Sequence, residues 1–240
     1  MTQLHTIDNL DAFIAARAAW QSIGEHVFAK KRWLATEKIG LRVINGGVGT
    51  PHFGDDEQLW LTVDGMFASQ HGTTRHKPVS TLRAAAEFVN VEAGAPTSVF
   101  SPTTPLDLDA NLQTDPASAA ALQAWYTFAD GVIADLRQLH SDDDPSLVQL
   151  WPEHFDVACD FGDASTKSRA NYGASPGDGA IPTPYLYVGP WNAAERQDDP
   201  FWNESWGVAL RYDELLATAD PTIAAAEFFA RGYAHLRTAV

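Results

Sequence analysis

Residues 150–162, LWPEHFDVACDFG, carry the chain's clearest grouping of side chains able to do chemistry. If residues 147–161 form one strand, His154, Asp156 and Asp160 lie on the same face. An imidazole beside carboxylates suits general-base catalysis or a divalent metal ion, so these three are the candidate catalytic residues. A sheet face open to water also collects polar residues without any function, and that alternative stays open. The other face would be apolar apart from Glu153 and would carry Trp151, Phe155, Val157, Cys159 and Phe161.

Aromatic residues follow this segment and provide the second signal. Rings with a few polar groups form the walls of ligand pockets, and they also form ordinary packing layers. A histidine on the Gly/Pro-bounded loop GTPHFG adds a place where a ligand can approach the backbone. The candidate ligand-binding residues are Tyr185, Tyr187, Trp191, Trp202 and His52.

No established metal or nucleotide motif accompanies these residues. The sequence has no HExxH and no CxxC, so no motif supports a divalent metal beyond His154 and the carboxylates, and the cofactor stays unknown. NGGVGTPHFG matches neither phosphate-binding glycine motif. The single cysteine, Cys159, has apolar neighbours at alternate positions and is expected in the core, because free cysteines are usually buried.

Composition and charge restrict the partners. With 31 acidic and 16 basic residues the formal net charge is −15, which repels nucleic acids and anionic membranes. The N-terminal residues resemble no signal peptide, and no apolar stretch reaches the ~20 residues of a membrane span. With one cysteine no internal disulfide can form. We therefore expect a cytoplasmic protein without a nucleic-acid or membrane partner.

Hydrophobic periodicity predicts the elements that position these residues. Helices are expected from Asp8 to about Trp33, over 80–91, over 116–139 with Pro116 in the first turn, and after Asp220. Strands are expected near 38–46, in a hairpin over 57–70 with a turn at Asp64–Gly65, and in a second group. That group comprises 147–161, 169–175, 184–191 and 206–212.

The predicted fold class is α+β, with antiparallel sheet packed by helices on one face. Residues 1–91 form an N-terminal half, 92–115 a Pro/Thr/Ser-rich connector, and 116–240 a C-terminal half; the halves form either two domains or one compact domain. LRAAAEFV (82–89) and TIAAAEFF (222–229) resemble each other, which indicates either an internal duplication of an α-β-β-α unit or chance similarity of alanine-rich helices.

Two functions are compatible with this reading. One is binding of a small molecule on an aromatic-walled sheet face, with His154 and the carboxylates available for catalysis. The alternative is a non-enzymatic interaction protein that forms a homodimer or binds a partner through exposed aromatic residues such as Trp202.

Overall fold

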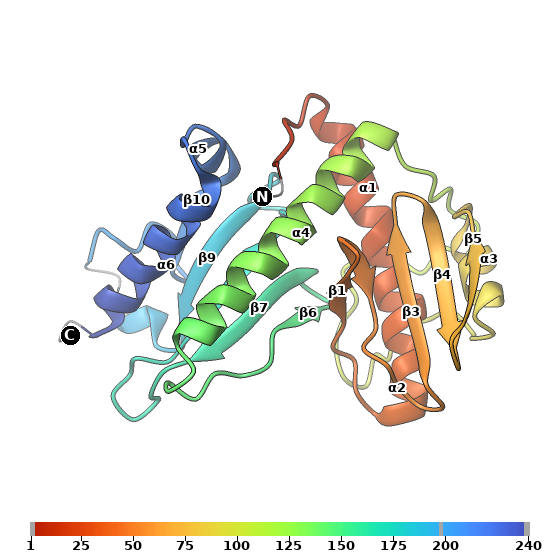
Figure 1. Cartoon of the computed structure of the whole chain (residues 1–240), viewed down its shortest axis with the longest axis horizontal. Helices are drawn as coiled ribbons and strands as arrows, with labels where there is room; N and C mark the ends of the chain where they lie inside the picture. Colours follow the sequence, from red (N-terminus) through yellow and green to blue (C-terminus); the bar gives the residue numbers. More distant parts are fainter. Residues whose placement is uncertain (1–2, 197–198, 238–240) are drawn as a thin grey trace. The chain divides into compact units, whose positions relative to one another are not determined.

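A computed structural model describes residues 3–196 and 199–237 of the 240-residue chain. The chain divides into two compact units, each discontinuous in sequence (Figure 1). The first comprises Met1–Thr127 and Gln149–Phe155, and the second comprises Phe128–Val148 and Asp156–Val240. The strands form two antiparallel five-stranded sheets, and helices accompany both. The fold class is therefore α+β, as predicted.

The first unit opens with a helical segment in three parts: α1 (Leu10–Ile23), the π-helix η1 (Gly24–Ala29) and α2 (Lys30–Thr36). Asn9, not Asp8, caps its start by accepting a hydrogen bond from the Ala12 N–H (3.1 Å). The change from α-helix to π-helix falls at Gly24, within the single helix expected from Asp8 to about Trp33. A glycine is required there because an added Cβ would lie 2.9 Å from the Phe155 ring.

The first sheet is a meander in the order β1-β2-β3-β4-β5. Alternation along β3 buries Leu59 and Leu61 and leaves Trp60 half-buried on the other face, stacked on Phe67 (5.2 Å). A helix α3 (Leu82–Phe88), capped by Thr81, and the first residues of α4 (Pro116–Leu139) follow the sheet in the chain. The strands are β1 (Arg42–Ile44), β2 (Gly47–Gly49), β3 (Glu57–Thr62), β4 (Gly65–Gln70) and β5 (Thr73–Lys77).

The second sheet is also a meander, in the order β10-β9-β8-β7-β6. Its strands are β6 (Gln149–Trp151), β7 (Asp156–Phe161), β8 (Ala170–Ser175), β9 (Tyr185–Pro190) and β10 (Val208–Arg211). The remaining helices are η2 (Ala193–Arg196), α5 (Tyr212–Leu216) and α6 (Pro221–Arg237).

In the second unit, α6 and the C-terminal end of α4 cover one face of strands β7–β10 (Figure 1). Phe229 of α6 contacts the Tyr172 ring of β8 (6.2 Å), and His140, just after α4, stacks on Phe161 of β7 (4.7 Å). The helices therefore pack on the apolar face, as predicted. Cys159 is buried on this face, also as predicted.

Two sequence predictions need correction. A single strand over 147–161 is wrong, because residues 152–155 form a turn between β6 and β7 in which Phe155 has a φ of 56°. The hairpin turn lies at Val63–Asp64, one residue before the predicted pair. The internal duplication is not confirmed: the similar sequences form helices of 7 and 17 residues, α3 and α6.

Within the described ranges, no helix has both the length and the apolar character needed to cross a membrane.

Candidate functional site

Strand alternation in the second unit separates two faces of the sheet. The pairings Gly173↔Tyr187 and Tyr187↔Ala209 align residues of β8, β9 and β10 in one row across the sheet. On the side away from α6, this register gathers a set of residues that we call the polar face. Its members are Asp156, Ala158, Asp160, Asn171, Gly173, Ser175, Tyr185, Tyr187, Gly189, Ala209 and Arg211.

Tyr187 and Asp156 form the centre of the polar face. The Tyr187 hydroxyl donates a short hydrogen bond to Oδ2 of Asp156, whose residue is only 5% exposed. Gly173 makes this contact possible, because a Cβ at that position would overlap the Tyr187 ring and hydroxyl. Burial, together with the negative charge of Asp156, raises the pKa of Tyr187 well above its ordinary value. Tyr187 therefore stays protonated and does not act as a base near neutral pH.

A second tyrosine–carboxylate pair lies beside the first. The Tyr185 hydroxyl donates to Oδ2 of Asp178 (2.7 Å), and Oδ1 of Asp178 accepts the Ile181 N–H (2.8 Å). Burial and the bond to Asp178 raise the pKa of Tyr185. Trp206 contacts both tyrosine rings, with centroids 6.1 Å from Tyr185 and 5.9 Å from Tyr187, and is 37% exposed. The three rings form a partly exposed aromatic wall beside two acidic groups.

Asp160 lies further along β7 in an ion pair. The Arg169 Nε donates to Oδ1 of Asp160 (2.7 Å), and the guanidinium carbon lies 5.2 Å from the centre of the Trp191 ring. The Trp191 Nε1 donates to Oδ1 of Asn171 (3.3 Å), while the residue is 60% exposed. Asp160 is therefore neutralised by a cation, and Trp191 presents a ring to solvent.

The structure places the other candidates elsewhere. His154 is exposed on the turn before β7 and belongs to the first unit, so the premise that one strand carries it together with Asp156 is wrong. His52 is exposed on a loop of the first unit, where its Nδ1 lies 2.9 Å from Oδ1 of Asp56. Trp202 is 7% exposed and packs against Phe201 (5.0 Å). Four of the eight candidates, Asp156, Asp160, Tyr185 and Tyr187, thus share the polar face, and Trp191 adjoins it through its hydrogen bond to Asn171.

Sequence reasoning left Gly173, Asp178 and Trp206 out of the candidate site. A glycine within an otherwise regular strand indicates close approach of another group, so Gly173 carried a usable signal. Trp206 belonged to the aromatic run but had no feature that separated it from its neighbours. Asp178 lies in a loop, and only the fold shows that it meets Tyr185.

The acidic groups of the polar face do not converge as metal ligands do. Among residues 3–196 and 199–237, no group of three His, Cys, Asp or Glu side chains is arranged to hold a metal ion. Comparisons with protein-family models, curated proteins and solved structures found no match to this chain.

Proposed function

We propose that the polar face binds a small neutral or cationic molecule that carries hydrogen-bond donors and an apolar surface. The observation that supports this proposal is the Tyr187–Asp156 hydrogen bond formed over Gly173. A residue without a side chain lets the tyrosine ring lie against the sheet, and its hydroxyl proton is directed inward to a carboxylate. The outward lone pairs of such a hydroxyl remain available as acceptors.

The surroundings define the ligand's chemistry. Trp206 and Tyr187 supply a wall against which an apolar surface packs. Asp156 and Asp178 lie behind the two tyrosine hydroxyls, and the chain as a whole carries a net charge of −15. An anion would be repelled by this field, whereas a cation or a neutral donor is favoured.

A screen of small molecules by thermal shift tests the proposal. We expect compounds that stabilise the wild-type protein to lose their effect with Trp206→Ala, which removes part of the wall. The same compounds should still stabilise the Trp60→Ala variant. Trp60 is a half-buried tryptophan of the first sheet, so this variant is the matched control. Tyr187→Phe keeps the ring but removes the acceptor, so it should weaken ligands that donate to it. Hits that are mainly anionic, or that bind Trp206→Ala as well as wild type, would refute the proposal.

Exposed aromatic residues favour a second candidate, an interaction surface without catalysis. Trp191 is 60% exposed, and a large exposed ring is typical of contact surfaces. In this case sedimentation velocity would detect a concentration-dependent homodimer that Trp191→Ala abolishes. Trp202→Ala is unsuitable for this test, because the side chain is buried and its loss would perturb folding.

A catalytic version of the small-molecule proposal assigns the base to Asp156 or Asp160, the two candidate catalytic residues on the polar face. Turnover of any ligand found in the screen would then fall with the matching Asp156→Asn or Asp160→Asn variant. A change in ligand affinity without any turnover in wild type would leave binding as the function and exclude this version.

A further inference from the structure

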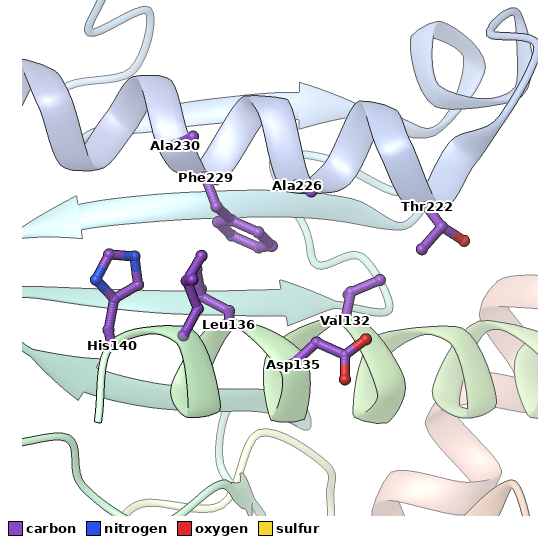
Figure 2. Close-up of a pocket in the computed structure, with 9 residues that line it drawn as sticks. Val132, Asp135, Leu136, His140, Thr222, Ala226, Phe229 and Ala230 are labelled. Atoms are coloured by element: carbon purple, nitrogen blue, oxygen red, sulfur yellow. The ribbon is translucent and has the colours of Figure 1, made fainter. Parts of the chain in front are cut away.

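A separate cavity lies in the second unit between α4 and α6. It has a volume of about 120 Å³ and opens to solvent beside exposed residues of both helices. Figure 2 shows the residues that line it: Leu136 and Phe229 lie in the middle, His140 at one end, and Asp135 with Thr222 toward the other. The cavity is on the helix-covered side of the sheet and shares no residue with the polar face.

Most of the lining is apolar, and one wall is made of small residues. Val132, Leu136 and Phe229 supply the buried surface, while Ala226 and Ala230 leave space between the helices. A cavity of about 150 Å³ lined by aliphatic and aromatic side chains is able to hold benzene. The observed volume therefore fits one ring or a short branched alkyl group.

Asp135 gives the cavity a charged rim. It is exposed on α4, and none of the ion pairs found within the described part of the chain involves it. Thr222 adds a hydroxyl from the first turn of α6. A carboxylate at the mouth of an apolar cavity favours a ligand with a positive charge next to its apolar part.

His140 closes the other end as a rigidly held ring. Its imidazole stacks on Phe161 (4.7 Å) and contacts the Tyr233 ring at a tilt of 40° (4.1 Å), and its Nδ1 lies 2.9 Å from Oδ2 of Asp143. Burial alone would raise the pKa of Asp143, but hydrogen bonds from Tyr233 and His140 outweigh it and lower that pKa. The ionised carboxylate only accepts, so the Nδ1 atom of His140 donates this hydrogen bond.

The helical rise limits the ligand's length. Asp135 and His140 are five residues apart, which corresponds to about 7.5 Å along α4. We propose that this cavity binds a small primary amine whose ammonium group pairs with Asp135 and Thr222 and whose single ring lies between Leu136 and Phe229, ending at His140. This site is independent of the function proposed for the polar face.

Benzylamine is a suitable probe, with toluene and benzoate as neutral and anionic analogues. Binding is followed by two-dimensional NMR of the full chain. We expect saturable shifts of the Val132 and Leu136 methyl groups with benzylamine, weaker effects with toluene, and none with benzoate. Asp135→Asn should weaken benzylamine binding about 5- to 10-fold and leave toluene unchanged. Asp142→Asn, an exposed acid outside the cavity lining, is the matched charge control and should change nothing.

A second substitution tests the cavity itself. Ala226 is exposed, so the larger side chain of Ala226→Leu fills the space between the helices without overpacking the core. This variant should abolish binding of both benzylamine and toluene. The proposal is overturned if benzoate binds as well as benzylamine. It is also overturned if Asp142→Asn weakens binding as much as Asp135→Asn, or if Ala226→Leu leaves it intact. A fall in sedimentation coefficient on Ala226→Leu would instead identify a second copy of the chain as the occupant and would overturn the proposal.

Discussion

Gly173→Ala is the most direct perturbation of the polar face, because it adds one methyl group beneath the Tyr187 ring. The ring must move, and its hydrogen bond to Asp156 is lost. A hydrogen bond to a charged group contributes about 1.5–3 kcal/mol, and a strained rotamer costs about 0.5–1.5 kcal/mol. The lower entropy of the unfolded alanine chain offsets about 0.4–1 kcal/mol. We therefore expect the free energy of unfolding to fall by about 1–4 kcal/mol.

Urea unfolding followed by tryptophan fluorescence measures this change, provided that the denaturant slope m is unaltered. Gly179→Ala is the matched control: an added Cβ there meets nothing within 4 Å, so its effect should stay within about 0.5 kcal/mol. In a Tyr187→Ala background the cost of Gly173→Ala should largely disappear, since the ring that it displaces is gone. An equal cost in both backgrounds, or a Gly173→Ala variant as stable as wild type, would refute the reasoning.

Three further predictions concern single side chains. Burial raises the pKa of Cys159 to about 12, so a thiol reagent at pH 8 should label it only in urea; rapid labelling of the native protein would contradict this. Folding lowers the pKa of Asp143. Its ionised carboxylate therefore stabilises the folded state at pH values above the unfolded pKa, and this stabilisation is lost as the pH falls through the folded pKa. Asp143→Asn should thus destabilise at pH 7 and differ less from wild type near pH 2, as urea titrations at both pH values would show. Trp202 is 7% exposed, so Trp202→Ala should lower the free energy of unfolding by roughly 3 kcal/mol in the same assay. Trp191 is 60% exposed, so Trp191→Ala should lower it by less than about 1 kcal/mol. Equal losses would contradict this assignment.

Elements with local signals were predicted correctly. α4 begins at Pro116, as the sequence indicated, and Asp115 caps it by accepting the Ser118 N–H (2.9 Å). Thr81 likewise caps α3, and Asp220 accepts the Thr222 N–H (2.9 Å) before α6. Caps and apolar periods depend on residues within a few positions of one another, so they can be recognised without the fold.

Elements that depend on distant contacts were missed. Phe155 takes a left-handed conformation that a bulky residue rarely adopts, and the Tyr126 hydroxyl donates to its carbonyl oxygen (2.8 Å). Tyr126 is far from Phe155 in sequence, so no local pattern indicates this contact. The alternation across residues 147–161 therefore predicted a single strand where the chain turns. β2 was missed for a related reason, because its glycines resemble a loop although neither Gly47 nor Gly49 has room for a Cβ beside β3.

The candidate site was predicted in part for the same reason. Alternation placed Tyr185 and Tyr187 on one face of β9, which the structure confirms as a shared face. Their partners come from other strands and loops: Asp156 from β7 and Asp178 from the segment between β8 and β9. Pairing across strands depends on register, which the sequence of one strand does not specify.

The discontinuous first unit affects how the chain acquires its structure during synthesis. Leu41 and Leu150 exchange both backbone hydrogen bonds (2.7 and 2.9 Å), the Gln21 side chain donates to the carbonyl oxygen of Glu153 (3.2 Å), and Phe155 is fully buried. Residues 1–127 therefore leave the ribosome before the strand that completes them. At about 5–20 residues per second, the delay before Phe155 is synthesised lasts roughly 1–6 seconds. During that interval the nascent chain exposes an unpaired strand edge and an unfilled apolar site, the two features that make an incompletely folded chain prone to aggregation.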